Sequence, residues 1–257
     1  MTISTLGIAI ALVMLALPLL VLYRFRAGIL MPMLRSVVRM LVQLVLVAMY
    51  LFFLFEWDNI YVNLAWMLIM TAVAALTTVS RARLLRRKML LSVSTGLLVS
   101  LVVTTLLLMV AFGIKNPLAT RFFVPAVALL LAGMAEMNAT ALNTFFQTAA
   151  ENQQQYYYLL GNGATRLEAV TPFIGKALSS AFAPLPARFA LLAVMTFPFF
   201  LSGLLLAGVD ALEAMKTLFL FVCATFFAST LATLTTLFVA SGNVFDAYNH
   251  MDNPLAN

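Results

Sequence analysis

Apolar residues occur along this chain in seven long runs, separated by short polar or charged stretches. A helix that crosses the hydrocarbon core of a bilayer needs about 20 mostly apolar residues. The pattern therefore predicts an all-α membrane protein, a polytopic bundle of about seven transmembrane helices in a single domain covering residues 1–257. The predicted spans lie near residues 5–23, 38–55, 60–79, 89–113, 122–148, 186–208 and 216–240.

The composition agrees with this pattern. Apolar residues make up 64% of the 257 residues and charged residues 9%, and the mean hydropathy is +1.05. A soluble globular domain has about 45–50% apolar and about 25% charged residues. A soluble fold of this length would expose much apolar surface to water, so we expect lipid to surround the chain.

The distribution of basic residues predicts the orientation in the membrane. If the N-terminus is outside, all but three of the 15 Lys and Arg residues fall in inner segments; the exceptions are Lys115, Arg121 and Lys216. Basic residues concentrate in cytoplasmic loops, so we predict an N-out, C-in topology, which an odd number of spans preserves. The net charge of +6 then reflects loops that face anionic lipid, and no nucleic-acid partner is expected.

Residues 24–39 alternate basic and apolar side chains between the first two predicted spans. This alternation predicts an amphipathic segment lying along the inner membrane surface. Arg39 and Gln43 follow one helical turn apart at the inner end of the second span. Arg39 can extend to lipid headgroups, and Gln43 is expected to hydrogen-bond a neighbouring helix, so both are interpreted as structural polar residues within the membrane.

Residues 149–185 form the longest predicted stretch outside the lipid. It begins with the polar run 151–155 and continues to Gly161-Asn162-Gly163, which interrupts a helix because Gly and Asn tolerate positive φ. Thr165 and Glu168 then match a capping box, in which each side chain satisfies an exposed amide at a helix start. The pattern predicts a capped helix at the cytoplasmic face, acting either as a surface connection or as a docking element.

Several ordered motifs carry a resemblance to a known family. They are Leu160, Gly163-Ala164-Thr165 and Ala169, the preceding polar run from Glu151, Arg39 with Gln43, Ala132-Gly133-Met134 with Asn138, Pro198, Ser202-Gly203, Gly208 and Ala214. In this order the set resembles the iron-exporter ABC permeases of the FetB type, from about residue 35 to residue 240. The chain departs from that pattern at Met137, where the family has Gly, and at Phe199-Phe200.

The resemblance implies an assembly of two permeases and two ATPases that exports substrate across the bacterial inner membrane. A second copy of the permease, an ATP-binding cassette ATPase and membrane lipid would then be the partners. The 257 residues contain no G-x-x-x-x-G-K-[ST] phosphate loop. ATP and Mg²⁺ are therefore expected on the partner ATPase, with no cofactor in this chain. The coupling residues that would fit its groove are Gly161, Gly163, Ala164, Thr165, Arg166 and Glu168.

Glu136 is the acidic residue expected deepest in the membrane, near the middle of the run 122–148. A carboxylate there costs at least about 2.5 kcal/mol on insertion scales, so it should face the bundle interior or water. It would contact a cationic substrate, or hydrogen-bond an Asn, Ser or Thr of the bundle. The candidate substrate-pathway residues are Glu136, Asn138, Asn143, Met134 and Met137. No metal site is predicted, since the methionines fit core packing better than metal binding.

Two other functions compete with the ABC permease. An ion-coupled secondary transporter would use Glu136 as a cation or proton site, but we find no inverted repeat in the sequence to support it. A membrane-embedded enzyme would need an acid–base or metal constellation, and the chain has one His and one Cys. We therefore predict no catalytic site in this chain.

Overall fold

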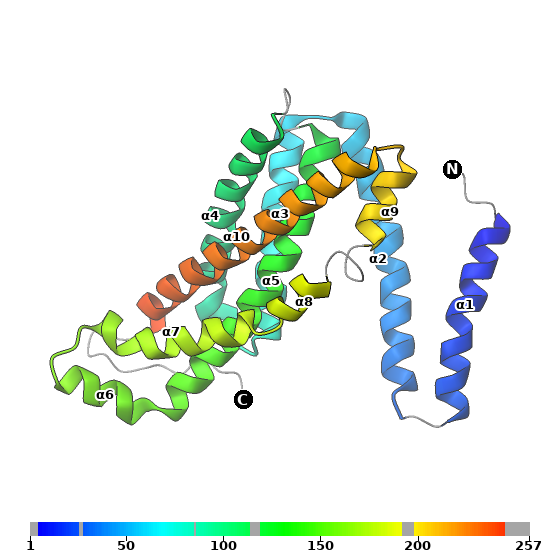
Figure 1. The fold of residues 1–257 in the computed structure, drawn as a ribbon. Coiled ribbons are helices and arrows are strands. Elements are labelled where there is room, and N and C mark those ends of the chain that lie inside the picture. Colours follow the sequence, from blue (N-terminus) through cyan, green and yellow to red (C-terminus); the bar gives the residue numbers. More distant parts are fainter. Residues whose placement is uncertain (1–4, 26–27, 85, 114–118, 192–197, 245–257) are drawn as a thin grey trace. The chain divides into compact units, whose positions relative to one another are not determined.

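The computed structural model describes residues 5–25, 28–84, 86–113, 119–191 and 198–244, which form ten α-helices (Figure 1). The described part of the chain is all-helical, as predicted. Contacts divide the chain into two compact units, Met1–Trp57 and Asp58–Asn257. The helices are α1 Thr5–Arg24, α2 Leu30–Trp57, α3 Ile60–Arg81, α4 Arg86–Phe112, α5 Thr120–Glu151, α6 Gln153–Gly161, α7 Arg166–Phe182, α8 Leu185–Leu191, α9 Pro198–Leu206 and α10 Ala211–Val244.

The first unit is a hairpin in which α1 contacts α2. It corrects the prediction of a separate amphipathic segment at residues 24–39. Residues from Leu30 onward belong to α2, which continues without interruption to Trp57. Pro32 is compatible with this start because the first turn of a helix leaves its amides unpaired, so proline costs no hydrogen bond there.

Five of the described helices are long and apolar enough to cross a membrane, namely α2, α3, α4, α5 and α10. The chain is therefore a multi-pass membrane protein. Each of these five coincides with one predicted span, and α1 is an apolar helix at the predicted first span. The predicted span at 186–208 corresponds to α8 and α9, which lie on either side of residues 192–197, outside the described residues. The count of seven spans stays a prediction.

In the second unit, α5 is the central helix and contacts α3, α4, α7 and α10 (Figure 1). Small residues allow these helices to approach closely, as is common in membrane bundles. A Cβ on Gly96 of α4 would lie 3.0 Å from the backbone nitrogen of Thr236 on α10. A Cβ on Gly133 of α5 would lie 2.5 Å from the methyl carbon of Thr225. Glycine is thus required where α10 crosses its neighbours.

A hydrogen-bonded clamp aligns the first turns of α3 and α5. Asp58 Oδ1 accepts from the amide of Thr120 at 3.0 Å and from its hydroxyl at 2.6 Å. Asn63 Nδ2 donates to the same hydroxyl oxygen at 3.0 Å. The hydroxyl of Thr120 lowers the pKa of Asp58 below its ordinary value, with the amide hydrogen bond as the next cause. An ionised Asp58 therefore holds the two helix starts level.

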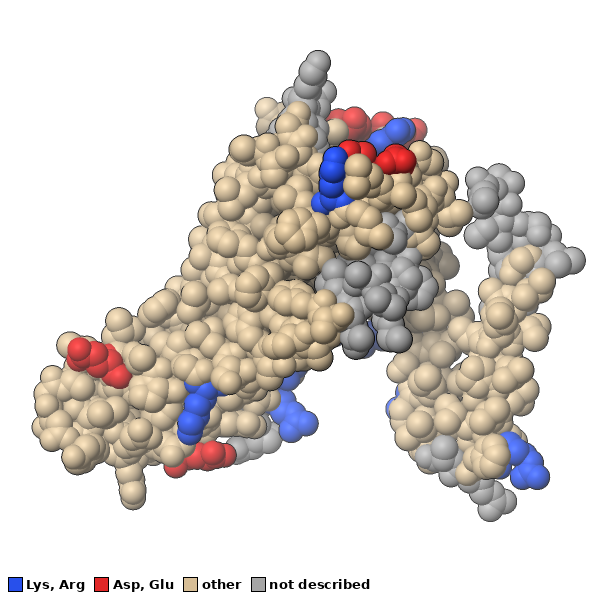
Figure 2. Space-filling model, viewed as in Figure 1, with Lys and Arg blue, Asp and Glu red and all other residues tan. Residues whose placement is uncertain are grey.

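The opposite end of this unit carries the α6–α7 hairpin (Figure 1). Helix α7 contacts α5, α6 and α10. Its buried side chains recur every three or four residues and form one apolar face: Ala169, Val170, Phe173, Ile174, Ala177 and Ala181. Figure 2 shows Lys, Arg, Asp and Glu gathered toward the two ends of this unit on the visible face, with uncharged residues between them. Membrane-spanning bundles have this distribution, with charged residues at the two ends and uncharged residues along the part that faces lipid.

Candidate functional site

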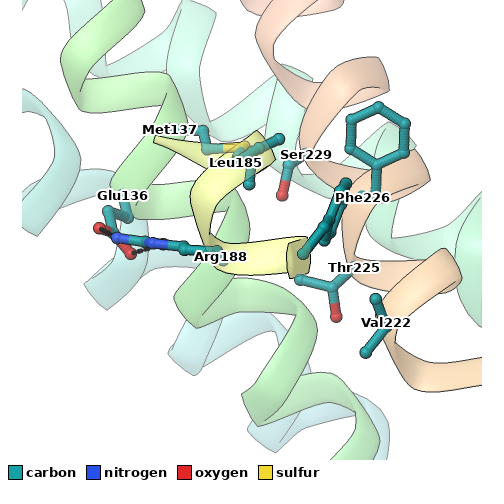
Figure 3. Close-up of a pocket in the computed structure, with 10 residues that line it drawn as sticks. Glu136, Met137, Leu185, Arg188, Val222, Thr225, Phe226 and Ser229 are labelled. Carbon is teal, nitrogen blue, oxygen red and sulfur yellow. Dashed lines mark hydrogen bonds and ion pairs between the residues drawn. The ribbon is translucent and has the colours of Figure 1, made fainter. Parts of the chain in front are cut away.

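Glu136 of α5 forms an ion pair with Arg188 of α8 (Figure 3). Arg188 Nη2 donates to Glu136 Oε1 at 2.7 Å, and Arg188 Nη1 lies 3.4 Å from Oε2. The two side chains are about half exposed, at 52% for Glu136 and 44% for Arg188. The paired fork of the guanidinium matches the two carboxylate oxygens, which is the strongest geometry for such a pair. The partner of Glu136 is thus an arginine rather than the Asn, Ser or Thr that the sequence suggested.

Glu136 and the end of α3 lie at similar distances from the clamped end of the bundle. Because Asn63 bonds to Thr120, α3 and α5 begin level, and both lead away from that end (Figure 1). At 1.5 Å per residue, Arg81 lies about 27 Å along α3 from Asn63, and Glu136 lies about 24 Å along α5 from Thr120. Glu136 therefore lies roughly level with the end of α3, and its expected depth in the membrane stays a prediction.

An apolar cavity of about 180 Å³ lies beside the ion pair. Met137 of α5 lines it together with Leu185 and Phe189 of α8 and with Phe226 of α10 (Figure 3). The rings of Phe189 and Phe226 meet edge to face, with centroids 5.6 Å apart. These aromatic contacts place α8 against α10 at the level of Arg188.

A second, polar cavity of about 480 Å³ shares Glu136 and continues along α5 toward α6. Its polar lining consists of Arg81, Glu136, Thr140, Asn143, Thr144 and Gln147. Thr144 Oγ1 donates to Ser180 Oγ on α7 at 3.0 Å, which ties this wall to the α6–α7 hairpin. Of the predicted pathway residues, Glu136, Met137 and Asn143 therefore line two cavities that share Glu136.

The other two predicted pathway residues lie in the core. Met134 is fully buried, and so is Asn138. Asn138 Nδ2 donates to Thr236 Oγ1 on α10 at 2.8 Å. The structure therefore separates them from the cavity lining and gives Asn138 a contact between α5 and α10.

The coupling region folds as the sequence predicts. Gly163 has φ +87°, and its amide and that of Ala164 donate to the carbonyls of Leu160 and Leu159 at 3.0 and 3.1 Å. This is the Schellman arrangement that ends a helix with glycine in the left-handed region. The predicted capping box of Thr165 and Glu168 is present at the start of α7. The hydrogen bond from the Thr165 amide lowers the pKa of Glu168, with the Thr165 hydroxyl as the next cause.

Arg166 contacts the end of α10 rather than pointing away from the chain. Its Nη2 donates to the carbonyl oxygen of Ser241 and, at 3.1 Å, to that of Gly242. A cation is favourable at the carbonyls that end a helix, because they carry partial negative charge. Arg166 therefore ties the start of α7 to α10, and its predicted contact with an ATPase stays a prediction.

Arg188 and Arg81 are the site residues that the sequence reasoning missed. In the sequence, both belong to the basic residues that predict the topology. Arg188 nevertheless lies inside a predicted span, and an ionisable residue there is a functional signal with an expected partner. Glu136 was the available partner, since few acidic residues lie in the predicted spans.

A metal centre is not found in the part of the chain that the structure describes, where no group of three His, Cys, Asp or Glu side chains could hold an ion. Arg39 and Gln43 of α2 belong to the first unit and make no side-chain hydrogen bond or ion pair with another described residue.

A family model for the uncharacterised protein family UPF0014 matches residues 5–245, which includes both units, the ion pair and the α6–α7 hairpin. The chain belongs to this family. One relative is the probable iron export permease protein FetB of Escherichia coli strain K12, 25% identical over 215 residues that cover 82% of this chain and 80% of FetB. The resemblance to FetB-type permeases is thereby confirmed.

A second relative in the family is the UPF0014 membrane protein YjkA of Bacillus subtilis strain 168. It is 22% identical over 192 residues, which cover 75% of this chain and 76% of YjkA. No solved structure matches the chain. The family is thus one of membrane proteins, and one of its relatives is named as a permease.

Proposed function

We propose that this chain is the permease subunit of an ATP-driven ABC exporter and that a separate ATPase drives it. The observation that carries the proposal is the rigidly capped α6–α7 hairpin at one end of a membrane bundle, tied to both α5 and α10. The Thr144–Ser180 bond links α7 to the wall of the polar cavity, and Arg166 links it to α10. Movement of this hairpin would therefore reach the helices that line the cavities. The name of FetB supports the permease assignment.

The hairpin offers an apolar surface to a partner. Tyr157, Tyr158 and Leu167 are 40%, 71% and 52% exposed, and aromatic side chains are enriched in protein interfaces. In the proposed assembly, two permeases in the bacterial inner membrane have their N-termini outside and their C-termini inside. The hairpin of each then faces the cytoplasm and docks in a groove of an ATPase that binds ATP and Mg²⁺.

The ion pair favours this proposal over ion-coupled transport. A proton- or cation-coupled carrier would need the Glu136 carboxylate to be available in its resting state. Arg188 instead engages both carboxylate oxygens, and charge-assisted pairs of this kind are strong. The relative FetB is named as a probable iron export permease. Iron is therefore the first metal to test as part of the exported substrate.

Co-expression with the ATP-binding cassette ATPase encoded by a neighbouring gene tests the proposal. We expect the two proteins to copurify and ATP hydrolysis in lipid nanodiscs to require both. An ATPase variant lacking its catalytic acid is the control and should copurify without hydrolysis. Transport driven by an ion gradient with the permease alone, or failure of any such ATPase to copurify, would contradict the proposal.

A further inference from the structure

The charges around Glu136 do not favour a cation. Arg188 already pairs with the carboxylate. Arg81 lines the same polar cavity. Arg188 lines the neighbouring apolar cavity. Two guanidinium groups therefore lie near one carboxylate, and these three groups together carry a formal charge of about +1 at neutral pH.

Three hydrogen-bond donors of this cavity have no protein acceptor among the described residues. They are the side chains of Arg81, Asn143 and Gln147, which line the wall beyond Glu136. The hydroxyls between them are engaged, since Thr140 donates to the carbonyl of Glu136 at 3.2 Å and Thr144 donates to Ser180. The unengaged groups thus consist of one guanidinium, whose charge favours an anion, and two carboxamides, whose NH2 groups can donate to the oxygens of that anion.

We propose that this cavity binds an organic anion, with its phosphate or carboxylate group at Arg81 and Arg188, as the exported substrate. The inference rests on the proposed function and specifies its substrate class. Guanidinium groups present planar pairs of donors that match phosphate and carboxylate oxygens. A bare divalent cation would instead need several free carboxylate or carbonyl oxygens. A metal ion would fit here only as a complex whose ligands leave it anionic.

The apolar cavity next to the ion pair explains why the anion is organic. Leu185, Phe189 and Phe226 line it together with Arg188 and Glu136. An inorganic anion would leave these side chains without a ligand contact. A molecule with a compact ring or aliphatic part can place that part against the two phenylalanines while its anionic group reaches the arginines.

Direct binding to the purified full-length chain in phosphatidylcholine nanodiscs tests the inference without an ATPase. The probes share one ring and differ in charge: phenyl phosphate, phenol and benzylamine, with Mn²⁺ as a bare cation. We expect saturable binding of phenyl phosphate in the millimolar range or tighter, and binding of the other three at least about tenfold weaker. Saturable binding of benzylamine or Mn²⁺ without phenyl phosphate would overturn the proposal, and so would no binding of any probe.

Three variants and one control test whether phenyl phosphate binds at the arginines of this cavity and of the ion pair. Arg81→Gln and Arg188→Gln should each weaken phenyl phosphate binding about tenfold or more, because each removes a charge-assisted hydrogen bond. Glu136→Gln should strengthen phenyl phosphate binding, because it removes the carboxylate charge that competes with the anion for Arg188. Arg121→Gln, on α5 near the clamped end, is the matched control and should have no effect. Because Arg188→Gln also releases α8 from Glu136, Arg81→Gln is decisive, and wild-type affinity in that variant would refute the proposal.

Repeating the binding measurement in nanodiscs that contain an anionic lipid distinguishes a soluble anionic ligand from the phosphate of a lipid headgroup. We expect phenyl phosphate binding to persist when phosphatidylglycerol is added to the nanodiscs. Loss of binding there would assign the arginines to lipid and overturn a soluble substrate. If phenyl phosphate binds but no ATPase copurifies, the anion site stands and the ABC assignment fails. If an ATPase copurifies but no anion binds, the ABC assignment stands and the anion site is refuted.

Discussion

Gly96→Leu is expected to separate α4 from α10 and to abolish folding of the membrane bundle. A Cβ at this position would overlap Thr236 Oγ1 and lie 3.0 Å from the Thr236 nitrogen and 3.1 Å from its Cα. The backbone of α10 cannot move away without breaking the hydrogen bond between Asn138 and Thr236. Overpacking of a dense core costs about 1–3 kcal/mol, occasionally more, and three further carbon atoms add to the overlap. The thermal midpoint and the monodisperse yield in nanodiscs measure this effect.

Gly175→Leu is the matched control for this prediction. Gly175 lies within α7, and a Cβ there would meet no heavy atom within 4 Å. The same added side chain should therefore leave the midpoint within a few degrees of wild type. If Gly96→Leu folds with the wild-type midpoint, the close crossing of α4 and α10 is not present in the native bundle.

Gly163→Val is expected to uncouple ATP hydrolysis from the permease while the bundle still folds. Gly163 has φ +87°, a region that a β-branched residue almost never adopts. Residues held in such regions cost about 1–3 kcal/mol each, and the turn would relax by changing the angle between α6 and α7. Since no heavy atom lies within 4 Å of a Cβ at this position, the effect acts through the backbone. The ATPase rate of the reconstituted complex and hydrogen exchange at the start of α7 measure it.

Gly161→Val supplies the comparison within the same turn. Gly161 is the last residue of α6, has no positive φ, and is equally free of neighbours within 4 Å. Gly161→Val should reduce the hydrolysis rate little, because valine is no worse than glycine as a helix residue and the position needs no positive φ. Equal hydrolysis rates in the two variants would show that the left-handed turn has no part in coupling.

The helices were largely predictable because six of the seven apolar runs coincide with one helix each; the run 186–208 instead holds α8 and α9, on either side of residues outside the described part. The differences arise where hydropathy carries no information about helix breaks. Residues 30–39 contain enough charge to resemble a surface segment. No helix-breaking residue separates them from the apolar run that follows, so both form the single helix α2. The capped start at Thr165 was predictable because a capping box depends only on residues three apart.

The candidate site was only partly predictable. Glu136 stood out as an acidic residue in an apolar run, but Arg188 is 52 residues away in the sequence. Hydropathy describes each segment by itself, so it cannot pair an arginine of α8 with a glutamate of α5 that only the fold brings together. Helix α5 has 32 residues, about 48 Å at the helical rise, which exceeds the thickness of the hydrocarbon core, so hydropathy alone does not fix which of its residues lies at the midplane.

Site-specific photo-crosslinking to the co-expressed ATPase tests the central claim, that the α6–α7 end of the bundle docks the ATPase. A photoreactive residue would replace Tyr158 of α6, which is 71% exposed, or Leu212 at the start of α10, which is 64% exposed and lies at the opposite end (Figure 1). We expect a crosslinked permease–ATPase product at position 158 and none at position 212. A product at 212, or none at 158 when the two proteins copurify, would contradict docking at the hairpin.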